Sequence, residues 1–146
     1  MRLWSIDILK FLPDLQFRGQ LREMMLILRD LRDKGHTNHL LINMVMEYPK
    51  NDFARYFVLY EAIYHKRYGK WLTKQWEEFK AFDDTPLDER SNGCFEGWHN
   101  KEYLRVCMAN LYEKHVFGVG NSRITDDEWQ RLVDGYKQIM GEEYVI

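Results

Sequence analysis

The chain of 146 residues has the length of one domain, and its 45% hydrophobic and 30% charged residues exclude a wholly disordered protein. Three prolines and nine glycines are too few for a turn-rich β-sandwich or barrel. The net charge is −2, yet residues 1–80 hold 14 basic and 10 acidic side chains whereas residues 81–146 hold 7 and 13, which leaves room for a basic face on an acidic protein.

Helical periodicity begins near the amino terminus. From Pro13 onward apolar residues recur at spacings of three and four, which predicts a long helix that ends near Gly35. The mostly apolar stretch from His39 to Tyr48 predicts a short buried helix, closed by Pro49 because proline cannot continue a helix.

Two further helices follow in the same pattern. Asn51 or Asp52 can cap the first of them, whose aromatic stripe runs up to Gly69. The second is expected over residues 71–82. Residues 83–98 are rich in turn-forming residues and predict a loop.

The last part of the chain predicts two more helices. Asn100 can cap one of them. Thr125 and Glu128 have the spacing of a capping box, in which hydroxyl and carboxylate satisfy the first amide groups of a helix that Gly141 ends. No segment predicts a strand, so we expect one compact all-α domain over residues 1–146.

Metal and nucleophile motifs are weak. Cys94, His99 and Cys107 match no zinc spacing and lack a fourth ligand, so neither a metal nor another cofactor is expected. Cys107 falls on the apolar side of its helix and is interpreted as a small core residue. The segment Gly118–Gly120 holds two glycines without the preceding strand that a phosphate-binding loop needs.

The segment from His65 to Trp76 interleaves five cations with three aromatic rings. Cations can neutralise phosphates while flat rings stack on exposed bases. A solvated helix end whose rings turn inward to the core explains the same composition, and composition alone favours that second interpretation.

A polar strip interrupts the apolar pattern of the first long helix. Gln16, Gly19, Gln20 and Glu23 share one helix face at spacings of three and four. The strip could be the floor of a pocket, with a carboxylate partly out of water and Arg22 beside it. Two ordinary surface charges at Arg22 and Glu23 are the simpler interpretation of this pattern alone.

Short motifs along the chain have the order and spacing of a known family. They are Met1-Arg2-Leu3-Trp4, Leu12-Pro13, Gln16-x-x-Gly19-Gln20-x-Arg22-Glu23, His39-x-x-x-Asn43, Tyr56 to Tyr60, Trp98 to Leu104 and Asn110 to Lys114. Together they resemble the pyrimidine-dimer DNA glycosylase family, that of phage endonuclease V and its bacterial relatives, over roughly residues 1–80 and 98–115. The resemblance implies a compact all-α domain of the endonuclease V type.

The resemblance implies a DNA glycosylase coupled to an abasic-site lyase that needs no metal. The family's nucleophile is the α-amino group of the first residue, here Met1, and a glutamate early in the first long helix, here Glu23, assists. Because Arg2 is too large for removal of the initiator methionine, we expect Met1 to be retained. An α-amino group has a pKa of about 7.7–8.0, so a useful fraction is neutral near pH 7.

The partner that the resemblance implies is double-stranded DNA with a damaged or abasic site. Candidate DNA-binding residues have basic or amide side chains: Arg2, Gln16, Arg18, Gln20, Arg22, His39, Lys66, Arg67 and Lys70. Among them Arg2 and Arg22 would hold phosphates, and the two glutamines with His39 would position the opened duplex. The lesion stays open between a cyclobutane dimer, another base lesion and a plain abasic site.

Two features of the phage enzyme are missing here, its strongly basic charge and its tail rich in Trp, Tyr and Lys. The basic-aromatic run from His65 to Trp76 is a candidate substitute. A second function class is a non-catalytic helical module that binds DNA or protein. A nucleotide-processing enzyme that uses His39 and Glu23 ranks last, because no loop cradles a phosphate.

The expected setting is a cytoplasmic monomer, associated with the nucleoid when bound to DNA. Two cysteines cannot make a disulfide framework. Asp7 lies where a signal peptide needs apolar residues. No apolar run approaches the roughly 20 residues that cross a bilayer, so no membrane partner is expected.

Overall fold

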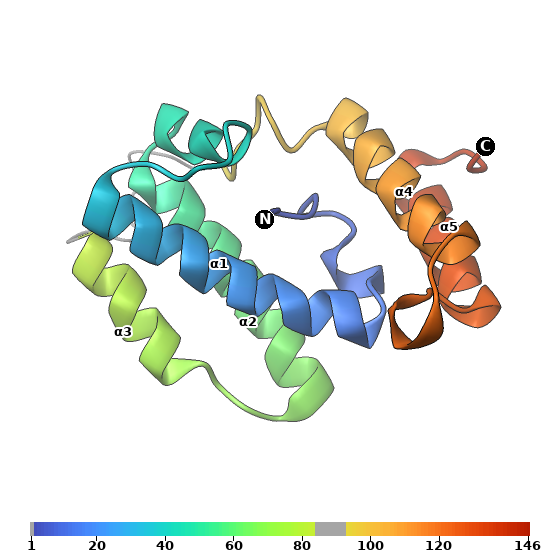
Figure 1. The fold of residues 1–146 in the computed structure, drawn as a ribbon, viewed down its shortest axis with the longest axis horizontal. Coiled ribbons are helices and arrows are strands. Elements are labelled where there is room, and N and C mark those ends of the chain that lie inside the picture. The colour runs from blue at the N-terminus through green and yellow to red at the C-terminus, as the bar shows by residue number, and fades with distance from the viewer. Residues whose placement is uncertain (1, 84–92) are drawn as a thin grey trace. The chain divides into compact units, whose positions relative to one another are not determined.

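The protein is described by a computed structural model that covers residues 2–83 and 93–146 (Figure 1). Within these residues every regular element is a helix, which confirms the all-α prediction. The α-helices are α1 (Asp14–Lys34), α2 (Lys50–Tyr68), α3 (Thr73–Phe82), α4 (Lys101–Val116) and α5 (Asp126–Met140), and the 3-10 helices are η1 (Leu9–Phe11), η2 (Ile42–Glu47) and η3 (Gly120–Ser122). None of the helices in the described ranges is long and apolar enough to span a membrane.

Contacts between residues divide the chain into two compact units. Unit 1 comprises Met1–Leu3 and Gln20–Trp98, and unit 2 comprises Trp4–Gly19 and His99–Ile146. Helix α1 begins in unit 2 and continues in unit 1. The expected single domain over the whole chain stays a prediction.

In unit 1 the helices α2 and α3 are joined by an aromatic core. The Phe79 ring of α3 lies 4.9 Å from the Phe53 ring and 4.7 Å from the Phe57 ring of α2, measured between centroids. A forked ion pair joins α1 to α3, since the Arg29 guanidinium donates to both carboxylate oxygens of Glu78 at 3.0 and 2.9 Å. Part of the high aromatic content of the sequence therefore belongs to this core.

Helix α2 starts earlier than the sequence predicts. It begins at Lys50, directly after Pro49, with no side chain capping it, so the predicted cap at Asn51 or Asp52 is wrong. The Asp52 carboxylate is buried and accepts a hydrogen bond from the Phe95 N–H at 3.0 Å. The carboxylate thus fastens a distant segment of unit 1 instead of capping its own helix.

The segment from His39 to Tyr48 is not the buried helix that its composition predicts. Only the 3-10 helix η2 forms there, and Leu40 and Leu41 are 86% and 78% exposed. The Asn43 side chain accepts from the Thr37 N–H at 2.7 Å and donates to the Thr37 carbonyl at 3.1 Å. These bonds close a turn over residues 37–43, and the helix begins only inside that turn.

The remaining predictions for unit 1 concern helix ends and the loop. Gly35 and Gly69 follow α1 and α2 with φ angles of 76° and 70°, as expected for glycines that end helices. Helix α3 starts at Thr73, so Trp71 lies outside it. Of the predicted loop, residues 84–92 lie outside the described residues, and the rest has no helix or strand.

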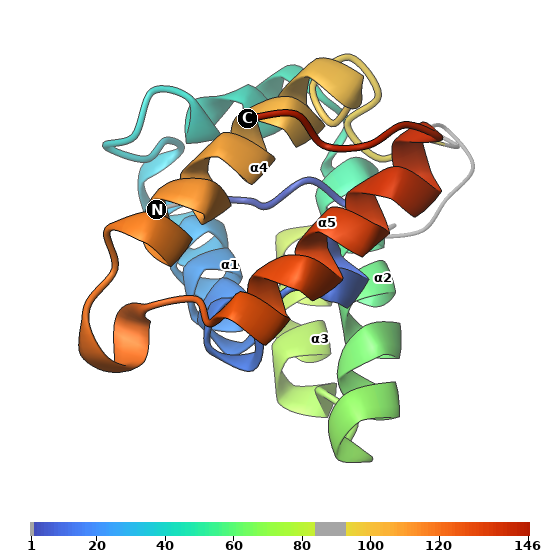
Figure 2. The same ribbon diagram turned by 90° about the vertical axis from the view of Figure 1, so that its right-hand side faces the viewer.

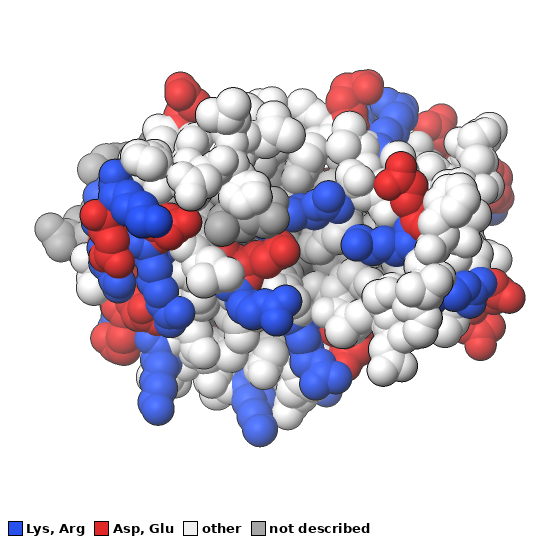
Figure 3. All heavy atoms as spheres, viewed as in Figure 1, with Lys and Arg blue, Asp and Glu red and all other residues white. Residues whose placement is uncertain are grey.

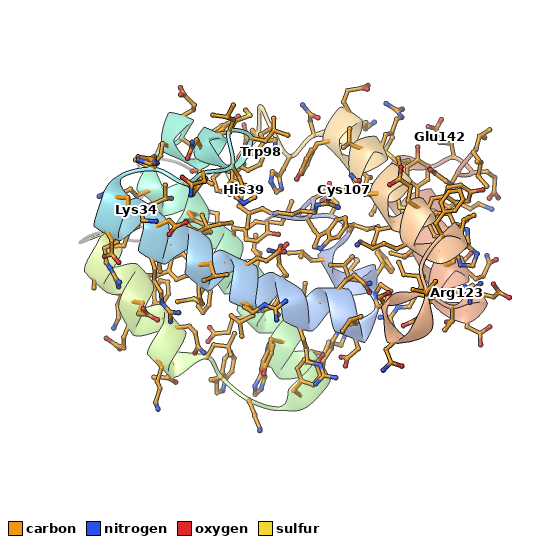
Figure 4. All side chains as sticks on the ribbon, viewed as in Figure 1. Lys34, His39, Trp98, Cys107, Arg123 and Glu142 are labelled. Carbon is orange, nitrogen blue, oxygen red and sulfur yellow. The ribbon has the colours of Figure 1, made fainter. Side chains whose placement is uncertain are left out.

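Unit 2 is built on α4 and α5, which pack side by side (Figures 1 and 2). The Asn100 side chain accepts from the Tyr103 N–H at 3.0 Å, and Thr125 and Glu128 form a reciprocal capping box, so both predicted caps are confirmed. Cys107 of α4 is 1% exposed, which confirms it as a core residue (Figure 4).

The buried imidazole of His99 holds the start of unit 2 in place. Its Nδ1 accepts a hydrogen bond from the Ile6 N–H at 3.2 Å, and the side chain is 7% exposed. Burial lowers the pKa of His99 from 6.5 to about 3, because a charged imidazolium would lose its hydration. The folded protein therefore keeps His99 neutral well below pH 6.5.

Unit 2 should lose stability as the pH falls below 6.5. The unfolded chain binds a proton at His99 there while the folded chain does not, so the free energy of unfolding falls by up to about 1.4 kcal/mol per pH unit. Urea unfolding at several pH values above the titration range of the carboxylates measures the slope. His99→Asn, whose amide oxygen can still accept from Ile6, should show a smaller slope; equal slopes would contradict the assignment.

Candidate active site

The amino-terminal segment of unit 1 is tied to the helices by one buried amide. The Gln20 Nε2 of α1 donates to the Arg2 carbonyl at 2.8 Å, and its Oε1 accepts from the Tyr56 hydroxyl of α2 at 3.3 Å. Gln20 is 1% exposed and Leu3 fully buried. Residues 2 and 3 are therefore fixed against the protein interior, and the position of Arg2 is set by both helices.

Glu23 lies one helical turn beyond Gln20 on the same face of α1. Its side chain is half-buried, and that of Arg22 is exposed. Within residues 2–83 and 93–146 neither side chain forms an ion pair or a hydrogen bond. The helix face that carries Gln20 thus also carries a partly exposed carboxylate, with a cation next to it in the chain.

The other predicted residues of the amino-terminal motifs are not all assigned to unit 1. Met1 lies outside the described residues, and Arg2 is half-buried. Gln16 and Arg18 belong to unit 2, where Arg18 forms an ion pair with Asp14. The structure therefore groups Arg2, Gln20 and Glu23 in unit 1 and gives Gln20 an internal contact instead of an exposed position.

His39 is exposed at the turn that leads into η2 (Figure 4). Its backbone is held by Thr37, whose Oγ1 donates to the His39 carbonyl at 3.0 Å and accepts from the His39 N–H at 3.1 Å. The imidazole is thereby presented to solvent on a closed turn, together with the exposed Leu40 and Leu41.

The basic-aromatic run spans the end of α2 and the start of α3. Lys66 and Lys70 are exposed and Arg67 is half-buried. Two of the three rings turn inward, since Tyr68 packs on Tyr64 and Trp76 on Phe57, but Trp71 is 62% exposed. The run therefore matches neither the DNA-binding interpretation nor that of a solvated helix end with inward rings completely, because it contributes both to the core and to a cationic surface.

Charged side chains are not evenly spread over this part of the protein. Acidic and basic surface lies side by side along α1 on the face shown in Figure 3. Basic side chains stand out along the lower edge of the same view, where α2 ends and α3 begins. No group of three His, Cys, Asp or Glu side chains suited to a metal occurs in the described part of the chain.

Sequence reasoning missed the roles of Tyr56 and Gln20 as anchors. Tyr56 is fully buried, and its hydroxyl needs a partner there. The position of Gln20 at the border of an apolar helix stripe could have indicated this role. A buried amide must satisfy both its donor and its acceptor, so such a glutamine is expected to bind other groups of the protein.

Unit 1 thus contains a backbone segment fixed by a buried amide, a half-buried carboxylate at Glu23 and two arginines, Arg2 and Arg22. Residues 1–68 match the family model described as pyrimidine dimer DNA glycosylase, which supports the family that the sequence motifs indicate. That family consists of DNA glycosylases, enzymes whose substrate is DNA. No curated protein and no solved structure matches the chain. The second stretch of motifs, residues 98–115, lies outside the matched part.

Proposed function

We propose that this protein is a DNA glycosylase with abasic-site β-lyase activity, and that the α-amino group of Met1 is its nucleophile. The observation that carries the proposal is the hydrogen bond between Gln20 and the Arg2 carbonyl at 2.8 Å. It fixes the backbone of Arg2, the residue next to Met1, to Gln20, and Gln20 lies one helical turn from Glu23. The family match covers all four of these residues.

The reach of the chain supports this assignment. Residues three positions apart on a helix have Cβ atoms about 5–6 Å from each other, so Gln20 and Glu23 are neighbours. One residue spans at most about 3.6 Å of chain. We therefore propose that the amine directly before the anchored Arg2 acts within reach of the Glu23 carboxylate.

The reaction follows from the chemistry of a neutral amine. Its lone pair attacks the sugar C1′, the bond from C1′ to the base breaks, and the base leaves with a proton. Opening of the sugar ring at C1′–O4′ yields an imine between the amine and C1′. The imine acidifies the C2′ proton, whose removal expels the 3′ phosphate oxygen and cuts the strand.

Glu23 is proposed to have two roles in this reaction. Its carboxylate stabilises the positive charge that develops at the sugar, and it carries protons between the amine, the ring oxygen and C2′. Arg22 and Arg2 are proposed to hold the phosphates on either side of the opened sugar. Gln20 is a positioning residue, since its amide binds the backbone of Arg2 and not the substrate.

Three further groups complete the proposed DNA contacts. His39 on its closed turn, with Gln16 and Arg18 of unit 2, would contact the opened duplex or its phosphates. Lys66, Arg67 and Lys70 would neutralise phosphates farther along the duplex. The family name favours a pyrimidine dimer as the lesion, and the lyase step also admits a plain abasic site.

A panel of end-labelled duplexes tests the proposal. We expect cleavage of a duplex with one abasic site, with an unsaturated aldehyde at the 3′ end and no effect of a metal chelator. Cleavage of a duplex with a thymine dimer would assign the glycosylase step, and an intact duplex should stay uncut. Tight binding of the abasic duplex without cleavage would favour a non-catalytic DNA-binding module.

DNA affinity should fall steeply with salt if the proposed basic residues contact phosphates. The logarithm of the binding constant loses about 0.9 per neutralised phosphate for each tenfold rise in salt. Replacing Lys66, Arg67 and Lys70 together by alanine should flatten that slope. The matched control replaces the exposed Lys101 and Lys114 of unit 2. An equal slope in both variants would place the DNA contacts elsewhere.

A further inference from the structure

The exposed indole of Trp71 is held flat on an imidazole. The Trp71 and His65 rings stack with centroids 3.8 Å apart and planes 10° from parallel. Trp71 is nevertheless 62% exposed, so His65 covers one face of the indole and the opposite face is open to solvent. Large apolar rings in such a position expose surface that another flat group can cover.

The backbone on both sides of Trp71 is fixed. Gly69 ends α2 in the left-handed conformation, with its N–H donating to the His65 carbonyl at 2.7 Å. The Leu72 N–H donates to the Glu61 carboxylate at 2.8 Å, and the Leu72 side chain is buried. The indole is thus a preorganised surface on a short, anchored connection between α2 and α3.

The surroundings of Trp71 favour a negatively charged partner. The Glu61 carboxylate near Trp71 is engaged by the Leu72 N–H. No acidic residue occurs between His65 and Trp76, whereas Lys66, Lys70 and Lys74 are exposed, so positive charge predominates on the surface of this segment. A flat ring flanked by cations fits a nucleic-acid strand, whose bases stack while its phosphates meet the lysines. In a closed duplex both faces of each base are already stacked, so only an unpaired base can use the open face of the indole.

We propose that Trp71, supported by His65, is a stacking platform for an unpaired base of the DNA strand. The choice of DNA as the ligand rests on the proposed function, but the platform is separate from Glu23 and from the chemical steps. A duplex opened at a lesion exposes bases of this kind. The platform would hold one of them and thereby favour opened over intact duplex.

Three probes of equal length separate stacking from charge. The first is a single-stranded oligonucleotide of about 12 nucleotides, a length that suits one basic groove with stacking rings. The second has the same phosphates but abasic tetrahydrofuran sugars, and the third is a hairpin duplex whose loop is a linker without bases. The protein should bind the first probe more tightly than the second, because only the first offers bases.

Substitution of Trp71 should remove that preference. Trp71→Ala should weaken binding of the base-bearing strand by about 5- to 150-fold, as expected for one lost stack, and leave the base-free strand unchanged. Trp71→Tyr should keep most of the preference. Lys70→Ala should weaken both strands alike, because it removes charge and not stacking. Far-ultraviolet circular dichroism of each variant checks that the helices remain.

The outcomes distinguish the platform from the proposed enzyme. Cleavage of abasic DNA by a protein without the base preference would overturn the platform and leave the enzyme standing. A base preference that Trp71→Ala removes, in a protein that cuts no DNA, would support the platform and refute the enzyme. Unchanged binding of all three probes by Trp71→Ala would also overturn the platform.

Discussion

Replacing Glu23 by glutamine should slow strand cleavage at an abasic site by about 10²- to 10⁴-fold, the contribution of a positioned acid or base. The amide keeps the size and polarity of the side chain but removes its charge and its ability to carry protons. DNA binding should stay near the parental level or become tighter, because a negative charge near phosphate is gone. Single-turnover cleavage and a binding titration on the same duplex measure both effects.

A matched control comes from the same unit. Glu47 is an exposed glutamate of η2. Glu47→Gln should cleave like the parent, since a surface charge contributes only a few tenths of a kcal/mol to stability and nothing to the reaction. Thermal unfolding of both variants shows whether the fold is intact. A folded Glu23→Gln protein that cleaves at the parental rate would refute the catalytic role of Glu23.

Replacing Gln20 by leucine should reduce the cleavage rate at saturating DNA by about 10²-fold, because misplacing a reacting group by about 1 Å can cost that much. Leucine cannot bind the Arg2 carbonyl, so the segment that carries the proposed nucleophile is released. The Michaelis constant should change less than the rate, because Gln20 is 1% exposed and Arg2 is only one of several proposed phosphate contacts. Steady-state kinetics well below the melting temperature separate the two quantities.

Loss of folding must be distinguished from loss of position in this variant. Gln20→Leu also removes two hydrogen bonds, to the Arg2 carbonyl and to the Tyr56 hydroxyl, each of which contributes about 0.5–1.5 kcal/mol to stability. Tyr56→Phe removes only the hydroxyl, so the bond from Gln20 to Arg2 at 2.8 Å can remain. Tyr56→Phe should therefore lose some stability but little cleavage. Equal loss of cleavage in both variants would show that Gln20 supports the fold and not the amine.

Local signals in the sequence predict the helices well. Thr125 and Glu128 form the capping box that their spacing predicts, and Gly69 and Gly141 end their helices with φ angles of 70° and 74°. Each of these features depends on atoms within a few residues of each other. The sequence alone is sufficient to predict such features, because the groups that interact belong to the same helix end.

Features that depend on distant partners are not predictable in the same way. Asp52 lies where the sequence predicts a helix cap, but its carboxylate accepts from the N–H of Phe95, 43 positions away. The stretch beginning at His39 has the composition of a buried helix, but the Thr37 and Asn43 bonds hold it as a turn with exposed leucines. In both cases a tertiary or side-chain contact outweighs the local preference.

The candidate site has both locally determined features and features that depend on distant partners. Spacing places Gln20 and Glu23 on one face of α1, and the family motifs single out both residues. That Gln20 faces inward and holds Arg2 follows from the packing of α2, which supplies Tyr56. The outward position of Trp71 likewise depends on where α3 starts, two residues later than composition predicts.

Borohydride trapping tests the central claim, that the α-amine of Met1 attacks the sugar. Incubation with an abasic duplex and borohydride reduces the imine to a stable amine, so a covalent adduct of protein and DNA should form. Digestion and mass spectrometry should place the adduct on the Met1 amine, and blocking that amine by reductive methylation to a tertiary amine should prevent it. An adduct found only on a lysine, or none at any protein concentration, would contradict the proposed nucleophile.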